Sequence, residues 1–180
     1  IWIVFNGEIY NFNLIRRELE KKGHEFKTTS DTEVIIHAYE EYGPNCVKKL
    51  DGMWAFAILD TINKTLFLSR DRMGQKPVYY YVNGDKFMFS SQPKTFTALS
   101  TFNKKLSDIG MVYYVAYGFI PSPYSIYENV YKVEAAHNLI YDLRKKEITA
   151  YYCYDELLPL FAKKMSKTRE EYLKDVDSLL

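Results

Sequence analysis

The stretch 53–59, Met-Trp-Ala-Phe-Ala-Ile-Leu, is apolar at every position. Successive side chains of a strand point to opposite faces, so an apolar run without alternation predicts a strand that is buried on both faces. Residues 66–68 return as a second apolar strand. Residues 77–89 contain Asn83-Gly84 between two aromatic-rich segments, which is the strongest short signal for a β-hairpin. The centre of the chain is therefore predicted to be an antiparallel sheet.

Helical patterns flank this sheet. Ser30-Asp31-Thr32-Glu33 matches the capping box that begins helices, and Val34, Ile35 and Ala38 follow on one helical face. Helices that alternate with antiparallel hairpins predict a layered α+β domain. The other expected elements are strands at 1–5, 24–28, 138–142 and 147–152, and helices at 11–22 with Asn11 as cap, at 44–50, at 107–117 with Ser107 as cap, and from 168 onward.

Two polar positions are candidates for chemistry. Asn6-Gly7 is expected to break the first strand, because this dipeptide favours turns. An Asn side chain donates through its N–H groups and a glycine leaves its backbone N–H open, so adjacent donors at a strand end can form an oxyanion hole. Taken alone, this pair favours a plain turn. Taken alone, Asp31 is likewise explained by helix capping and by the helix dipole.

Charge and composition exclude several classes of function. Lys+Arg 24 against Asp+Glu 23 give a formal net charge of +1, so no broad field favours a nucleic acid or an acidic membrane as partner. No apolar run reaches the ~18 residues of a membrane span. The two cysteines, Cys46 and Cys153, form no Cys-x-x-Cys pair, which favours a reducing compartment, and we expect a cytoplasmic protein.

The sequence carries no recognised metal or phosphate motif. His24, His37 and His137 stand apart in the sequence, without partners at metal-binding spacing, so structural roles and no metal site are expected. Residues 70–77, Arg-Asp-Arg-Met-Gly-Gln-Lys-Pro, hold one glycine between basic residues. A hydrogen-bonded turn between strands is favoured there over a phosphate site. Both cysteines are expected to be core thiols.

Both ends of the chain are expected to continue in a longer protein. The first residue is Ile1 rather than Met, and the apolar run 1–5 starts without a lead-in. The last helical pattern still places apolar residues at its end. A complete small protein with a processed start is the alternative.

Four ordered motifs resemble the glutamine amidotransferase domain of glutamine-hydrolysing asparagine synthetases. The resemblance covers residues 1–155, and the later segments 117–121 and 136–137 share it. It implies an N-terminal-nucleophile hydrolase fold of class α+β, a four-layer α/β/β/α sandwich with two antiparallel sheets that is incomplete at its N-terminus. The four motifs are Asn6-Gly7-Glu8-Ile9-Tyr10-Asn11, Ser30-Asp31-Thr32-Glu33-Val34, Asp51-Gly52-Met53-Trp54-Ala55-Phe56-Ala57, and the run from Arg70 to Tyr80.

The resemblance also implies roles for single residues. Asn6 and Gly7 would form the oxyanion hole, and Glu8 and Asp31 would hold the α-amino group of glutamine. These roles suit the residue types, since an oxyanion needs neutral donors and an ammonium needs acceptors. The family's nucleophile, a cysteine at the mature N-terminus, and its carboxylate-binding arginine are expected upstream of Ile1. The 180 residues alone are therefore expected to be inactive.

The same resemblance implies two domains with different reactions, one that releases ammonia and one that uses it. Glutamine-derived ammonia would pass to an ATP-dependent synthetase domain of the same parent chain, which aminates aspartate. ATP and Mg would bind there, with no cofactor in residues 1–155. The synthetase loop Ser-Gly-Gly-x-Asp-Ser is not among the 180 residues, and 156–180 are expected to be a helical linker or the start of that domain.

The resemblance is also compatible with a homodimer of the parent protein. Two alternatives stay open for the function. One is a silent amidotransferase domain in a related amide- or lactam-forming enzyme, such as β-lactam synthetase. The other is a non-catalytic interaction module.

Overall fold

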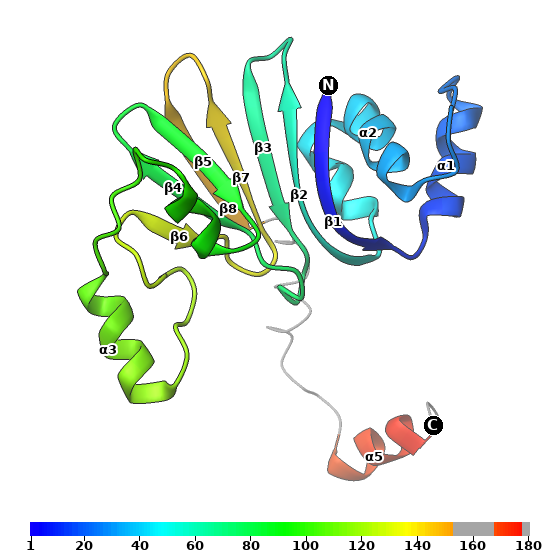
Figure 1. The fold of residues 1–180 in the computed structure, drawn as a ribbon. Coiled ribbons are helices and arrows are strands. Elements are labelled where there is room, and N and C mark those ends of the chain that lie inside the picture. The colour runs from blue at the N-terminus through cyan, green and yellow to red at the C-terminus, as the bar shows by residue number, and fades with distance from the viewer. Residues whose placement is uncertain (153–167, 178–180) are drawn as a thin grey trace.

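Two antiparallel sheets face each other in the computed structural model, which describes residues 1–152 and 168–177 (Figure 1). The predicted antiparallel centre of the chain is therefore confirmed. The larger sheet has the order β1-β2-β3-β7-β8, from β1 (Trp2–Ile9), β2 (Gly52–Asp60), β3 (Thr65–Arg70), β7 (His137–Asp142) and β8 (Glu147–Tyr152). The smaller has the order β5-β4-β6, from β4 (Tyr79–Asn83), β5 (Lys86–Ser90) and β6 (Val130–Lys132).

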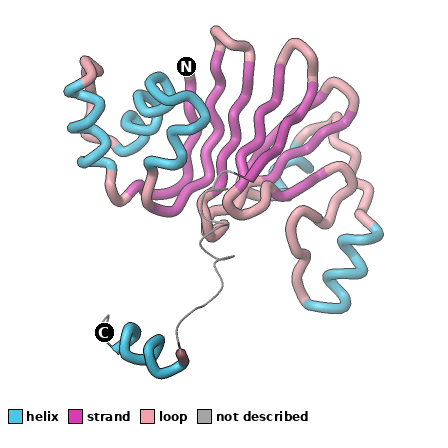
Figure 2. Tube along the Cα trace, turned by 180° about the vertical axis from the view of Figure 1, so that it is seen from behind, coloured by secondary structure: helices cyan, strands magenta, loops and turns pink. Residues whose placement is uncertain are grey.

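Helices cover the outer face of the larger sheet, as Figure 2 shows from behind. They are α1 (Phe12–Lys21), α2 (Asp31–Tyr42) and the short 3₁₀ helix η1 (Gly43–Lys49), which begins as expected around Pro44. Their apolar stripes pack on aromatic side chains of β2 and β3. Full burial of one such side chain stabilises the fold by roughly 1.5–3 kcal/mol. The main members of this core are Ile15, Leu19, Val34, Ile35, Ala38, Tyr39, Trp54, Phe56 and Phe67.

A second core fills the space between the two sheets. The small side chains Ala55 and Ala57 of β2 meet Val78 and the partly buried Phe89 there. The outer face of the smaller sheet buries Tyr81 under a thin layer that includes the 3₁₀ helix η2 (Pro93–Ala98). The predicted α+β class, with two antiparallel sheets and helices of the N-terminal-nucleophile hydrolase type, is confirmed.

Two local predictions are wrong. Residues 24–28 form no strand, because the N–H groups of Lys27 and Thr28 donate to the Glu33 carboxylate at 2.8 and 2.7 Å instead of to a partner strand. Asn11 precedes α1, but its side chain does not cap the helix. It donates to the Lys49 carbonyl at 2.9 Å and accepts from the Asp51 N–H at 2.9 Å, so it ties the start of α1 to the start of β2.

Ser30 and Ser107 cap their helices as predicted, but the reciprocal bond of the capping box at 30–33 is wrong, because Glu33 accepts from Lys27 and Thr28 and the Ser30 N–H donates to Thr28 Oγ1. Ser30 Oγ accepts the Thr32 N–H at 3.1 Å, and Ser107 Oγ accepts the Gly110 N–H at 3.2 Å in front of α3 (Asp108–Tyr117). Thr168 precedes α5 (Arg169–Asp177), the helix expected from 168 onward. The expected boundary at 155–156 lies outside the described residues. Within the described part of the chain, no helix is long and apolar enough to cross a bilayer.

Candidate active site

Asn6 and Gly7 lie inside β1 rather than after it. The strand continues to Ile9 and keeps its register with β2 throughout, with Gly7 opposite Trp54. The predicted strand break at Asn6-Gly7 is therefore wrong. A Cβ on Gly7 would lie 2.1 Å from the carbonyl oxygen of Met53, so the glycine permits a close approach of the two strands instead of a turn.

The backbone of β1 presents the Gly7 N–H at the outer edge of the sheet. The Ile9 N–H points away from β2 and donates to Asp31 Oδ2 at 3.1 Å, whereas the Tyr10 N–H donates to the Asp51 carbonyl at 2.7 Å. Backbone groups of successive residues in an antiparallel strand alternate between its two sides. Gly7 precedes Ile9 by two residues, so its N–H points outward as well. A ligand at the edge of β1 can therefore accept a hydrogen bond from Gly7.

The side chains of Asn6 and Glu8 share one face of β1, because they are two residues apart. Both are exposed. Val4 lies on the same face, opposite Ala57 of β2. This face is the one that the larger sheet turns toward the smaller sheet. The Asn6 amide and the Gly7 N–H thus come from adjacent residues, one above the sheet and one at its edge.

Asp31 begins α2 but does not cap it, since Ser30 does. Its carboxylate instead accepts the Ile9 N–H, which joins the start of the helix to the end of β1. A carboxylate offers about four lone-pair sites, so Asp31 keeps acceptor capacity for a ligand ammonium. Glu8 precedes Ile9 by one residue. Both predicted ammonium acceptors therefore lie at the C-terminal end of β1.

Gly7 and the Asp31 carboxylate lie along the outer edge of β1, whereas the side chains of Asn6 and Glu8 lie on the adjoining face of the strand. A strand rises ~3.3 Å per residue, so the Gly7 and Ile9 N–H groups lie ~7 Å apart along the edge. Asp31 lies at one end of this span and the Gly7 N–H lies at the other.

A cavity of about 220 Å³ opens beside Asn6 between the two sheets. Its lining is mainly apolar, and Asn6, Ser90 and Ser91 supply the polar side chains. This space exists because the β2 residues opposite β1 are alanines, and larger side chains would fill it. The lining residues are Val4, Phe5, Asn6, Ala55, Phe56, Ala57, Pro77, Val78, Phe89, Ser90 and Ser91.

The segment that carries Pro77 is held by a buried hydrogen-bonded turn, as the sequence predicted. Asp71 is fully buried and accepts N–H groups of Met73 and Gln75 on Oδ1, and those of Lys76 and Trp54 on Oδ2, at 2.9–3.2 Å. The Arg70 guanidinium donates to the Gly74 and Lys76 carbonyls of the same turn and to the Val133 carbonyl of the segment after β6. Burial lowers the pKa of Arg70. These groups are occupied within the protein, which favours a structural turn over a phosphate site.

Cys46 is a core thiol, as expected. It is fully buried in the helix–sheet core, and burial raises the pKa of its thiol to about 12. A thiol in this state is a poor nucleophile at neutral pH. Cys153 lies outside the described residues.

Sequence reasoning missed two features. Ser90 and Ser91 line the cavity, but a pair of serines after a strand carries no distinctive signal. His24 and His37 are not isolated, because their Nδ1 atoms are 3.3 Å apart. The expectation that no metal site exists rested on this supposed isolation. The spacing of His37 and Glu40, three residues apart on one helix, was the available signal.

The family described as "Glutamine amidotransferase domain" matches residues 1–152. This match covers the two sheets, the helical layer and the edge of β1 with its four candidate residues. The chain belongs to the glutamine amidotransferase domain family.

Several similar proteins are named as glutamine-hydrolysing asparagine synthetases. A Methanocaldococcus jannaschii protein, provisionally named as a glutamine-hydrolysing asparagine synthetase, is 48% identical over 91% of this chain and 32% of its own length. Asparagine synthetase [glutamine-hydrolyzing] 3 of Bacillus subtilis is 35% identical over 83% of this chain and 25% of its own length. The chain thus spans about a third or less of these relatives, and it is homologous to the amidotransferase part of such enzymes.

Solved structures support the fold alone. The glutamine phosphoribosylpyrophosphate amidotransferase of Bacillus subtilis has a TM-score of 0.56 at 19% identity and covers 85% of this chain and 29% of its own. A second structure, titled as the allosteric regulatory enzyme of purine biosynthesis, has a TM-score of 0.57 at 20% identity, with 85% and 28% covered. Both place the paired sheets in the N-terminal-nucleophile amidotransferase fold.

Proposed function

We propose that the outer edge of β1 binds glutamine in a glutaminase active site. The observation that carries the proposal is the arrangement at the end of β1. The Gly7 N–H lies at the outer edge with the exposed Asn6 side chain beside it, and the Ile9 N–H holds the Asp31 carboxylate two residues further along the strand. The family membership supports the same roles. Asn6 and Gly7 form the oxyanion hole, and Glu8 and Asp31 hold the α-ammonium of glutamine.

The proposed reaction is acyl transfer from the glutamine side-chain amide. A nucleophile adds to the amide carbon, and negative charge develops on the carbonyl oxygen. Neutral donors already aimed at this oxygen stabilise the transition state, and removal of one such donor typically lowers kcat ~10²–10³-fold. Asn6 donates through its side-chain amide and Gly7 through its backbone. Release of ammonia and hydrolysis of the acyl intermediate give glutamate.

The nucleophile is proposed to come from a segment that precedes Ile1 in a longer protein. Cys46 does not serve, because it is buried and its pKa is raised to about 12. The resemblance to asparagine synthetases implies a terminal cysteine whose own amino group acts as base. The open edge of β1 is where such a segment would meet the oxyanion donors.

The whole protein is proposed to be a cytoplasmic asparagine synthetase of the ligase class. Ammonia from this domain would pass to an ATP- and Mg-dependent domain of the same chain and amidate aspartate. The greater length of the relatives supports a second domain, and the family match ends at residue 152. Residues 156–180 would be the linker or the start of that domain.

The test is transfer of labelled amide nitrogen in the full-length protein. Glutamine with ¹⁵N in its side-chain amide is supplied with ATP, Mg²⁺ and aspartate, and the label is followed into asparagine while glutamate is counted. The proposal expects labelled asparagine and glutamate in equal amounts. Synthesis from free ammonia without any glutamate from glutamine would overturn it and favour a silent amidotransferase domain.

A further inference from the structure

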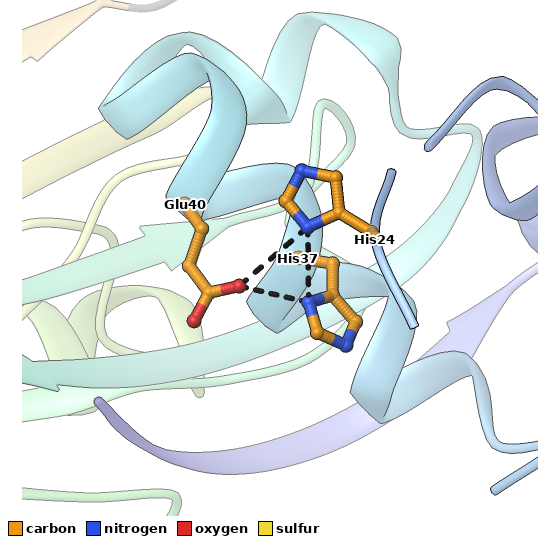
Figure 3. A group of neighbouring side chains, drawn as sticks. All are labelled: His24, His37 and Glu40. Atoms are coloured by element: carbon orange, nitrogen blue, oxygen red, sulfur yellow. Dashed lines mark hydrogen bonds and ion pairs between the residues drawn. The ribbon is translucent and has the colours of Figure 1, made fainter. Parts of the chain in front are cut away.

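Two histidines and a glutamate meet where the segment between α1 and α2 passes α2 (Figure 3). His37 and Glu40 lie one turn apart on α2, and His24 reaches them from the segment between α1 and α2. The two Nδ1 atoms are 3.3 Å apart. Glu40 Oε2 is 2.8 Å from Nδ1 of His37 and 3.8 Å from Nδ1 of His24.

The far side of each imidazole ring faces another carboxylate. His24 Nε2 lies 3.2 Å from Glu41 Oε2, within hydrogen-bond distance, and His37 Nε2 lies 3.8 Å from Glu33 Oε1, at ion-pair distance. A carboxylate favours a proton on the nitrogen that faces it, and a neutral imidazole carries one N–H. On His24, Glu41 favours a proton on Nε2 and leaves Nδ1 with a lone pair. On His37 the nearer carboxylate is Glu40, at 2.8 Å from Nδ1, so without an ion the proton lies between these two atoms. A cation at the point where both Nδ1 atoms and Glu40 Oε2 converge would take the place of that proton.

The distances fit a small tetrahedral ion. Zinc binds imidazole nitrogen at about 2.0–2.1 Å and carboxylate oxygen at about 2.0–2.2 Å, so two ligand atoms of a tetrahedral site lie ~3.3–3.5 Å apart. The observed separations of 3.3, 2.8 and 3.8 Å lie within ~0.6 Å of this range. Two imidazoles and one carboxylate suit zinc and its neighbours, whereas Mg²⁺ and Ca²⁺ prefer oxygen ligands.

We propose that His24, His37 and Glu40 bind a divalent transition-metal ion, with Zn²⁺ as the best match and water at the fourth position. The ligand side chains are 17%, 18% and 38% exposed, so an ion can enter from solvent. The Phe26 ring, 4.6 Å from the His37 ring and edge-on to it, restricts that imidazole. The site would join the connection after α1 to the middle of α2. None of the three ligands belongs to the proposed glutaminase site, and His37 lies six residues, or ~9 Å along the axis of α2, from Asp31.

The first test is zinc binding by chelator-treated protein, measured by calorimetry and by competition with a chromophoric chelator. One equivalent is expected to bind with a Kd of about 1 µM or tighter, as for other sites that fix a fold. His24→Gln and His37→Ala should each weaken binding at least ~100-fold. Glu41→Gln should weaken it about 10-fold through the outer carboxylate. His137→Ala is the matched control, because its ring lies on β7 with Nδ1 at 2.8 Å from the Ala135 carbonyl, and it should bind like the parent.

The second test distinguishes metal binding by these three residues from binding by cysteine, and a loss of binding from a loss of folding. Co²⁺ should give a visible d–d spectrum without a thiolate charge-transfer band, which a cysteine site would show. Zinc at 100 times the parent Kd should raise the thermal midpoint by roughly 5–10 °C in the parent and the His137→Ala variant, by about half as much in Glu41→Gln, and by ~2 °C or less in the His24→Gln and His37→Ala variants. Absence of saturable binding, or equal binding by the His24→Gln variant, would show that the two rings merely share a proton and would overturn the proposal.

Discussion

Asp31 Oδ2 accepts a hydrogen bond of 3.1 Å from the Ile9 N–H, and this bond fixes the first residue of α2 against the last residue of β1. The contact gives Asp31 a structural role other than helix capping. It also holds a negative charge beside the strand edge that carries Gly7, a proposed oxyanion donor. The two roles can be separated, because an amide oxygen still accepts a backbone N–H but carries no charge.

Asp31→Asn should therefore keep the fold and impair glutamine use. Loss of a charge-assisted bond to the substrate ammonium is worth ~1.5–3 kcal/mol, which lowers glutamine-dependent kcat/KM about tenfold or more. Ammonia-dependent synthesis by the full-length variant should match that of the parent. Asp31→Ala loses the bond to Ile9 as well, so its thermal midpoint should fall by a further ~2–4 °C. A lowered midpoint with unchanged glutamine kinetics in Asp31→Asn would make the residue purely structural.

Gly7→Ala should destabilise the fold through steric overlap. The new Cβ would meet the Met53 carbonyl oxygen at 2.1 Å and Trp54 Cα at 2.8 Å, so β1 must move away from β2. A forced displacement of this kind costs ~1–3 kcal/mol beyond the backbone strain of the positive φ. Gly23→Ala is the control, since Gly23 also has a positive φ but nothing lies near its Cβ. Urea unfolding should show the larger loss for Gly7→Ala, and equal losses would contradict the close approach.

Asp71→Ala should be among the most destabilising substitutions in the chain. It leaves four backbone N–H donors around a fully buried position without their acceptor. Each such orphan costs ~1–3 kcal/mol unless water reaches it, so a total loss of at least ~3 kcal/mol is expected. Asp71→Asn retains one acceptor oxygen and should lie between the parent and Asp71→Ala in thermal midpoint. Parent-like stability of Asp71→Ala would show that the turn is not held by this carboxylate.

Cys46 should resist alkylation in the folded protein. The thiolate is the reactive form, and burial raises the pKa of this thiol to about 12, so the thiolate fraction at pH 8 is ~10⁻⁴. Because the folded pKa is raised, reactivity should grow only as the pH approaches 12 or as the protein unfolds. Peptide mapping after iodoacetamide treatment should find Cys46 modified in denaturant and unmodified without it. Rapid labelling of native protein at pH 8 would contradict its burial.

Much of the fold could be predicted from local patterns. The apolar run 53–59 and the Asn83-Gly84 hairpin gave the antiparallel centre, and Ser30 and Ser107 gave two helix starts. These signals depend on neighbours in the sequence, which is why they succeed. The hydrogen-bonded turn at Asp71 was predicted for the same reason, since its donors lie within five residues, apart from Trp54.

The failures concern contacts between distant residues. Asn6-Gly7 has the composition of a turn, and only the approach of Met53 explains why a strand needs the glycine. Residues 24–28 looked like a strand, but the Glu33 side chain satisfies their backbone. His24 and His37 are thirteen residues apart, and no local sequence pattern predicts that their rings lie within hydrogen-bond distance. The roles of Asn6, Gly7, Glu8 and Asp31 came from family likeness. The structure places all four near the C-terminal half of β1, with Gly7 and Asp31 at its outer edge and the other two side chains on one face.

The most direct test of the glutaminase site is the kcat of the full-length Asn6→Ala variant with glutamine and with free ammonia. Loss of one oxyanion donor should lower glutamine-dependent kcat ~10²–10³-fold, with a smaller change in KM because the donor acts mainly on the transition state. Ammonia-dependent kcat should stay at the parent value, and Asn13→Ala, at an exposed asparagine on α1, should leave both unchanged. Glutamine-dependent kcat equal to that of the parent would show that Asn6 is only a strand residue and would contradict the site.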